Sequence, residues 1–462
     1  MEKPSIFSQS YLERRDPKAY DKQWRHLINL CRSYNDPFTY LGGEEKYRKQ
    51  QKDDFLSGKI ENPVLDYPDI NIEDIDRREK KLLEIKEYIL KKEKREFVRQ
   101  AYKWRINELV AGFRMLKATA SGNMKRFQRY TEYIYGNPSR DIFSYSVEKI
   151  RANLENYLDS DNLDLQSAAQ NLFDALPKDL PEAKVIHLPG QDVISNAKKI
   201  IDEEFSNLFE MPSEKKELDA EDICLIASQI IKDKKAFDWK AILIDGGSGS
   251  SLSVDQERKQ FKIPKAKTVS PSEFTGTARH EAGRHFFRRI EGDRSRLRLL
   301  GIGLDRYDRG EEGVATATEQ AAEERMDDFA GLASHLAISL AIGLDGKPRN
   351  FRDTYEWMKK YFTFLKVKNG KSFSSAETEA RSNAWAICIR TFRGTNCSTP
   401  GVCFTKDIVY REGNIETWGI LEENPEEAHR FSVGKYDPAN MRHLWILDQM
   451  AIEDQDLEYL EK

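Results

Sequence analysis

Apolar residues recur at steps of three and four positions from Ile75 to Ala118, which is the spacing of one face of an amphipathic helix. Charges of both signs fill the positions between them, as on a solvated helix face. Two more helical stretches, SYSVEKIRANLENYL and DLQSAAQNLFDAL, follow along the chain. The pattern therefore predicts a helical region over residues 71–176. The residues that set its period are Leu82, Ile85, Ile89, Phe97, Tyr102, Ile106, Leu109, Val110 and Phe113.

The pattern changes on either side of this region. After Pro177, the runs AKVIHLPG, WKAILID and KQFKIPK are rich in β-type residues and end at turn residues, so they predict short strands. Helical patterns then resume, and LASHLAISLAIGL at 332–344 predicts a buried helix. Residues 1–70 are polar and turn-rich, which predicts an irregular extension with short helices. The expected fold is α+β and helix-dominated, with a small sheet.

Composition limits the possible partners. The 74 basic and 78 acidic residues nearly cancel, and the net charge of −4 gives no electrostatic reason to expect nucleic acid. We expect no membrane span and no signal peptide, because the chain lacks the apolar runs that they require. The odd number of cysteines and the absence of a C-x-x-C pair favour free thiols in a reducing, cytoplasmic compartment. These cysteines are Cys31, Cys224, Cys388, Cys397 and Cys403.

The stretch HEAGRH places His280 and His285 five positions apart around Glu281. In a regular α-helix, side chains five apart point about 140° away from each other. A single π-turn adds one residue and returns them to one face, and such turns concentrate at functional sites. Gly283 lies between the two histidines, and a glycine there suits a helix that must accommodate an additional residue in one turn. The stretch alone leaves two interpretations open, which are a metal site on a wide helical turn and a helix whose histidines are unrelated.

A zinc site needs a third protein ligand and an open position for water. The later stretch GEEGVATATE offers Glu311, Glu312 and Glu319. The same glutamates can equally form an acidic helix N-terminus that interacts favourably with the helix dipole. The residues alone do not decide between the two.

Several sequence blocks occur in the order and spacing of one family. They are TARHEAGRHFFRR, LGIGLDRYDRGEEGVA, FRG and FTKDIVYREG. They resemble the microtubule-associated tyrosine carboxypeptidase family, whose bacterial members carry H-E-x-x-x-H and a QEGLA-type motif. EEGVA departs from that motif at Glu311 and Val314, and its ligand-type glutamate falls on Glu312. The resemblance covers roughly residues 75–460 and implies a zinc carboxypeptidase that releases a C-terminal tyrosine or phenylalanine, without implying tubulin as the substrate.

The resemblance implies a role for each residue of the motifs. Zn²⁺ is bound by His280, His285 and Glu312, and Glu281 is the general base that takes a proton from the metal-activated water. Glu311 is expected to face solvent or cap its helix. Residues 177–462 form the catalytic domain, and the helical region at 71–176 packs on it.

A carboxypeptidase also needs a cation for the substrate's terminal carboxylate, because an unpaired buried charge is prohibitive. We predict Arg393 and Lys406 for this role and Tyr410 as a donor to the oxyanion. Lys406 and Tyr410 share a face if FTKDIVYREG is a strand. Alternatively, Lys406 and Asp407 form an ordinary loop ion pair and Arg393 holds a turn.

The expected substrate is the C-terminus of a peptide or protein, and the oligomeric state is left open. Two other functions remain possible on the sequence. The same metal site can belong to a zinc aminopeptidase or endopeptidase, or HEAGRH can be part of a non-catalytic scaffold.

Overall fold

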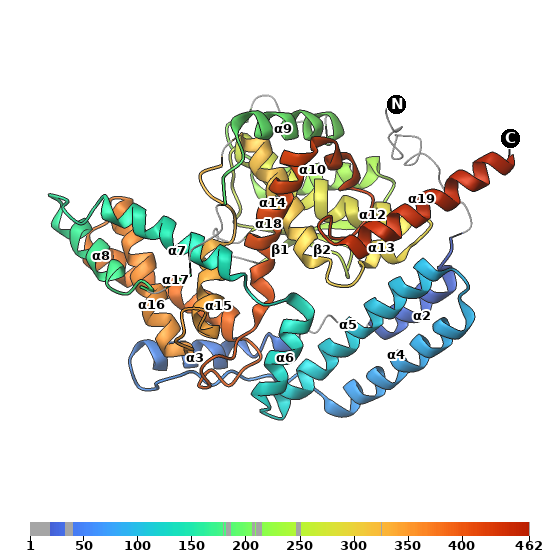
Figure 1. Ribbon diagram of the computed structural model, residues 1–462. Helices are drawn as coiled ribbons and strands as arrows, with labels where there is room; N and C mark the ends of the chain where they lie inside the picture. The colour runs from blue at the N-terminus through green and yellow to red at the C-terminus, as the bar shows by residue number, and fades with distance from the viewer. Residues whose placement is uncertain are drawn as a thin grey trace.

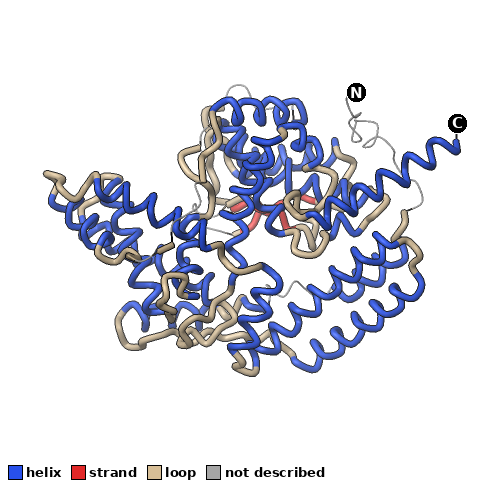
Figure 2. Tube along the Cα trace, viewed as in Figure 1, coloured by secondary structure: helices blue, strands red, loops and turns tan. Residues whose placement is uncertain are grey.

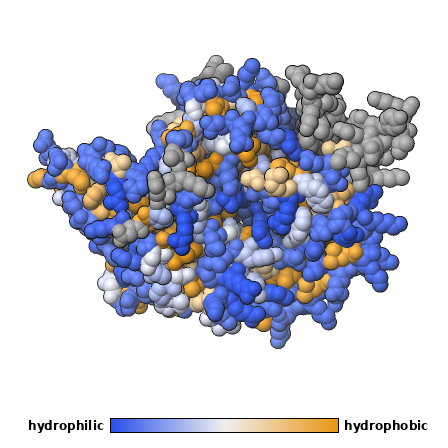
Figure 3. All heavy atoms as spheres, in the orientation of Figure 1, coloured by the Kyte–Doolittle hydropathy of each residue, from blue (hydrophilic) through white to orange (hydrophobic). Residues whose placement is uncertain are grey.

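The computed structural model describes residues 19–32, 40–178, 180–181, 186–205, 208, 215–245, 251–324 and 326–461. It is 66% helical and contains one small sheet of three strands (Figures 1 and 2). The predicted helix-dominated α+β fold is confirmed. Hydrophilic side chains cover most of the face in Figure 3, with small apolar patches scattered between them.

The longest helices of the first group lie at the lower right of Figure 1, and α19 extends above them to the upper right. The apolar faces of this group meet in one cluster of buried side chains, in which Leu82 and Ile89 of α4 contribute at the predicted helical spacing. Asn71 begins α4 by accepting a hydrogen bond from the Asp74 amide, as a helix cap does. The group comprises α2 (Lys22–Arg32), α4 (Ile72–Lys92), α5 (Glu96–Ala120), α6 (Met124–Tyr135), the short α13 (Leu299–Ile302) and α19 (Met441–Glu461).

A second group of helices surrounds a separate apolar cluster at the left of Figure 1. Phe55 is fully buried there, with its ring 5.1 Å from that of Phe351 and 4.8 Å from that of Tyr355. The apolar run at 332–344 forms the buried helix that was predicted. The group comprises α3 (Glu45–Leu56), α7 (Arg140–Glu155), α8 (Leu163–Phe173), α15 (Leu332–Ile342), α16 (Phe351–Lys368) and α17 (Phe373–Phe392).

The third group encloses the sheet and forms the upper centre of Figure 1. Its segments share one apolar cluster, to which Phe286 and Val314 contribute fully buried side chains. A short 3-10 turn, η3 (Thr405–Asp407), leads into the last long helix of this group. The group comprises α9 (Gln191–Phe205), α10 (Ala220–Asp233), α11 (Pro271–Ala278), the π-helix η2 (Arg279–Phe286), α12 (Phe287–Arg294), α14 (Asp308–Glu323), α18 (Ile408–Glu423) and η4 (Pro425–Arg430).

The sheet has the strand order β1-β3-β2. β1 (Lys240–Ile244) and β3 (Gln260–Pro264) are parallel, and β2 (Ser253–Asp255) pairs with β3 in the antiparallel direction. The strands predicted in WKAILID and KQFKIPK are confirmed, whereas β2 was not predicted. AKVIHLPG forms no strand over its described residues, 186–190, so that prediction is wrong there, and residues 183–185 lie outside the described part.

The apolar clusters cross the predicted region boundaries, since Phe55 packs against helices beyond residue 350. The division at residues 70 and 176 stays a prediction. All five cysteines are free thiols. Among the described helices, none combines the length and the apolar composition that a membrane crossing requires.

Candidate active site

The stretch HEAGRH lies in η2, which is a π-helix between α11 and α12. The wide turn brings both imidazoles to the same side, with the Nε2 atoms of His280 and His285 3.2 Å apart. The predicted wide turn is therefore confirmed. It solves the geometric problem of a five-residue spacing, because a regular α-helix would direct the two rings to nearly opposite faces.

The opposite face of η2 is fixed by close packing. A Cβ atom on Gly283 would lie 3.0 Å from the Phe205 ring, so glycine lets α9 approach the wide turn. The fully buried Arg284 donates to Thr318 of α14 at 2.8 Å and to Ser432 at 2.7 Å. Its guanidinium also lies 3.0 Å from the Glu204 carboxylate of α9. These bonds hold the π-helix against both α9 and α14.

Glu312 of α14 completes a cluster with the two histidines. One ligand atom from each of His280, His285 and Glu312 lies within 4.8 Å of the others. Two imidazole nitrogens bound to a tetrahedral zinc at about 2.0–2.1 Å would be about 3.3 Å apart. The observed 3.2 Å between the two Nε2 atoms fits that distance. The donor set also fits, since two imidazoles and a carboxylate are a common ligand set for catalytic zinc.

Two further glutamates hold the other nitrogen of each ring. His280 Nδ1 lies 3.1 Å from Glu319 Oε2, and His285 Nδ1 lies 2.9 Å from Glu311 Oε1. An ionised carboxylate only accepts hydrogen bonds, so both Nδ1 atoms donate and both Nε2 atoms face the cluster. This arrangement, in which a carboxylate orients a ligating histidine, is typical of protein metal sites.

The expectation that Glu311 faces solvent or caps its helix is wrong. Its side chain is only 4% exposed, and it lies 3.0 Å from Arg288 and 3.7 Å from Lys435, which are also buried. Burial favours the neutral acid, but these two cations and the bond to His285 hold the pKa of Glu311 well below its usual range. The acidic residue therefore stays ionised inside the protein.

The negative charges around His285 favour a cation at the cluster. Burial lowers the pKa of His285, but the bond to Glu311 and the charges of Glu312 and Glu281 outweigh it and raise that pKa to about 9. The same charges favour a divalent cation, which competes with protons for the imidazole.

Glu281 is directed at the sheet edge next to the cluster. Its Oε2 accepts a hydrogen bond from the backbone N–H of Val254 in β2 at 3.0 Å. Burial raises the pKa of Glu281 against the opposing charges of His285 and His280. A carboxylate with a raised pKa, fixed beside a candidate metal centre, is suited to accept and return a proton near neutral pH.

The segment FTKDIVYREG is helical from Thr405 onward, so the strand geometry considered for Lys406 and Tyr410 does not apply. Lys406 lies in η3 and Tyr410 in the first turn of α18. The two side chains still share a face, because residues four apart are neighbours on a helix. The charge of Glu312 is the largest influence on Tyr410 and raises its pKa, with burial acting in the same direction. The phenol therefore keeps its proton.

Lys406 also stays charged. Burial alone would lower its pKa, but the charges of Asp308, Asp407 and Glu312 more than offset it and raise the pKa above its usual range. The structure thus brings Lys406 and Tyr410 into the electrostatic surroundings of Glu312.

Arg393 has different surroundings. The charges acting on it most strongly are those of Asp407, Arg390 and Tyr67, and burial lowers its pKa. Arg390, which the sequence did not single out, bonds to Asp407 at 2.6 Å and also interacts with Tyr410. Its position three residues before Arg393, near the end of a helix, was the only sequence signal for it.

The fold and the cluster define a helical protein with a candidate centre of two histidines and one glutamate. The family model described as microtubule-associated tyrosine carboxypeptidase matches residues 181–452, more than half of the 462 residues. The chain belongs to the microtubule-associated tyrosine carboxypeptidase family. No curated protein and no solved structure matches it. Family membership indicates a carboxypeptidase-like enzyme whose substrate is a peptide or protein.

Proposed function

We propose that this protein is a zinc-dependent carboxypeptidase that hydrolyses the last peptide bond of its substrate and releases tyrosine or phenylalanine. The observation that carries the proposal is the convergence of His280, His285 and Glu312, with a carboxylate at the Nδ1 of each imidazole. The aromatic preference rests on the family alone. The free cysteines support a reducing, cytoplasmic location.

In this proposal, His280, His285 and Glu312 hold the zinc. Bound zinc lowers the pKa of water and polarises the scissile carbonyl. Glu281 takes the proton from the attacking water and delivers it to the leaving amine. Its hydrogen bond from Val254 fixes the carboxylate between the sheet edge and the cluster. The tetrahedral oxyanion accepts a hydrogen bond from Tyr410, whose proton the charge of Glu312 helps to retain.

Lys406 is the proposed partner of the substrate's terminal carboxylate. Its charge persists despite burial, and it lies among the groups that surround Glu312. A carboxylate that leaves water to enter the site needs such a cation. Arg393 stays a prediction for the same role.

The test uses three versions of one peptide that ends in tyrosine: unmodified, amidated at the C-terminus, and acetylated at the N-terminus. We expect mass spectrometry to show loss of the last residue from the unmodified and acetylated forms, and a chelator to abolish this loss. Cleavage that requires a free N-terminus would identify an aminopeptidase, and internal cleavage an endopeptidase. No cleavage, together with no stoichiometric zinc, would favour a scaffold.

A further inference from the structure

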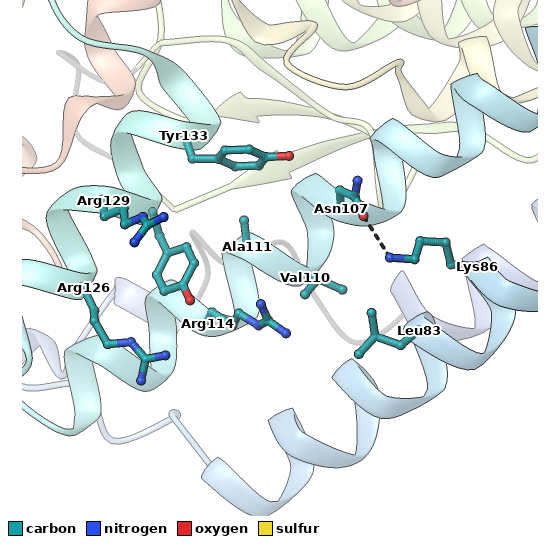
Figure 4. A pocket seen from close by; sticks show the side chains of 10 residues that line it. Leu83, Lys86, Asn107, Val110, Ala111, Arg114, Arg126, Arg129 and Tyr133 are labelled. Atoms are coloured by element: carbon teal, nitrogen blue, oxygen red, sulfur yellow. Dashed lines mark hydrogen bonds between the residues drawn. The ribbon is translucent and has the colours of Figure 1, made fainter.

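A groove runs between α4, α5 and α6, outside the candidate active site (Figure 4). It encloses about 450 Å³, within the range of specific ligand sites. Apolar side chains of Leu83, Val110 and Ala111 line part of it, and Figure 4 shows Arg126 and Arg129 extending from α6 and Lys86 from α4. It therefore combines an apolar surface with cationic walls.

The positive charge of the groove is largely uncompensated. Among the described residues, no carboxylate forms an ion pair with Lys86, Arg126 or Arg129, and Lys86 donates only to the Asn107 amide at 3.2 Å. Arg114 differs, because Glu79 neutralises it at 2.7 Å. In a chain with a net charge of −4, three cations around one groove are a local feature rather than a consequence of composition.

The chemistry of the groove selects a class of ligand. Guanidinium groups bind carboxylates with paired hydrogen bonds, so the walls favour an anion. Inorganic phosphate would leave the apolar surface and Tyr130 of the groove without contacts. A nucleic acid has no aliphatic side chains to pack against this apolar surface. A short polypeptide segment with carboxylates and at least one apolar side chain matches both parts of the groove.

Helix α6 connects the groove to the candidate active site. Its buried Thr131 accepts a hydrogen bond from the backbone of Thr405 at 3.0 Å, directly before Lys406. Tyr133 of the groove carries the Arg306 guanidinium over its ring at 4.6 Å. Arg306 in turn lines a second cavity with Asp308, the first residue of α14. A ligand in the groove thus lies against the helix that supports the Lys406 end of the site.

We propose that this groove binds an acidic segment of the substrate protein, upstream of the C-terminus that enters the candidate active site. The inference rests on the proposed function for the identity of the partner. Binding to the groove does not itself depend on the metal or on cleavage. An experiment can therefore contradict the groove proposal without contradicting the proposed carboxypeptidase activity.

The binding test uses the full chain, with a chelator present, and a fluorescent ten-residue peptide of glutamate and leucine with an amidated C-terminus. We expect the double variant Arg126→Glu and Arg129→Glu to weaken binding about tenfold or more, because two attractive contacts become repulsive. The matched control is Lys360→Glu with Arg381→Glu, which makes the same charge change on α16 and α17. Equal losses in the two double variants, or displacement of the peptide by inorganic phosphate, would overturn the proposal.

The kinetic test compares two cleavable peptides that differ only in an acidic or a neutral upstream segment. In the Arg126→Glu and Arg129→Glu variant, the KM for the acidic peptide should rise about tenfold relative to that for the neutral peptide. The control variant should leave this ratio unchanged, and an unchanged ratio in both variants would contradict the proposal. If the native protein binds the probe but cleaves neither peptide, the proposed function fails, and the assignment of the segment to a substrate fails with it.

Discussion

At the residue scale, a single substitution can directly test the contacts that two carboxylates make with the Nδ1 atoms of His280 and His285. Glu319 orients His280 from a position about two helical turns after Glu312 on α14, with a side chain that is 37% exposed. Because it is not deeply buried, its substitution should affect the metal more than the fold. Glu319→Gln should lower zinc affinity by about 10–100-fold, as measured by competition with a chromophoric chelator. The exposed Glu324, also near the end of α14, provides the control Glu324→Gln, and equal affinities in both variants would refute the orienting role.

Glu281 is proposed to act on protons and not on the metal. Glu281→Gln should therefore retain stoichiometric zinc and still accept the bond from Val254, while kcat/KM falls by about 10²–10⁴-fold. Metal analysis and a rate assay on the same sample provide the measurement. Near-native turnover with bound zinc would rule out Glu281 as the base.

Lys406 is proposed to bind the substrate's free carboxylate. Lys406→Ala should raise the KM for a peptide with a free C-terminus strongly and leave any residual cleavage of the C-terminal amide nearly unchanged. The measurement is the ratio of kcat/KM for the two substrates. Equal losses on both would mean that Lys406 supports the fold instead, and the same comparison with Arg393→Ala tests the remaining predicted cation.

The two histidines of the cluster could be predicted from local spacing and Glu312 from the family resemblance, but the burial of Glu311 could not be predicted. An acidic residue in the first turn of a helix is usually solvated, and only the buried Arg288 and Lys435 make its burial possible. Lys435 is far from Glu311 in the sequence. A single sequence contains no signal for such long-range compensation.

At the scale of elements, the approach of α14 to α18 sets the position of Glu312 relative to Tyr410. A Cβ atom on Gly413 would lie 2.1 Å from the carbonyl oxygen of Arg309, so the two helices touch through their backbones. Gly413→Ala should force them apart, destabilise the protein by about 1–3 kcal/mol and weaken zinc binding. Thermal unfolding and chelator competition measure the two effects.

The same helix provides the control for this change. A Cβ atom on Gly419 would meet no atom within 4 Å. Gly419→Ala should leave zinc affinity unchanged and raise stability by about 0.5–1 kcal/mol, since alanine is the better helix former. Similar destabilisation by both substitutions would contradict the backbone-contact argument.

The helices between residues 75 and 118, the buried helix at 332–344 and two of the strands could be predicted from the hydrophobic pattern, and the failures have physical causes. Ile408, Val409 and Tyr410 have high strand propensity, yet they begin α18 because Gly413 packs it against α14. The prediction that Lys406 and Tyr410 share a face held because a spacing of four places residues together in both geometries. β2 was missed because a three-residue strand is too short to show alternation.

At the scale of the whole molecule, the three apolar clusters separate the candidate metal centre from the helices of the groove. η2 and α14 both contribute to the cluster around the sheet, whereas α4 and α5 belong to another. A ligand that binds only the folded site stabilises the elements it joins, and local opening in proteins follows such units. Zinc should therefore protect some regions of the chain and not others.

Hydrogen exchange measures this difference directly. Removal of zinc with a chelator should speed amide exchange in Arg279–Phe286 and Asp308–Glu323 and leave Ile72–Lys92 and Glu96–Ala120 unchanged. In the control variant His285→Ala, which lacks a ligand, the chelator should have no effect. Uniform acceleration over all four helices would show that the metal stabilises the chain as one cooperative unit. No change in the native protein would mean that His280, His285 and Glu312 hold no metal in solution.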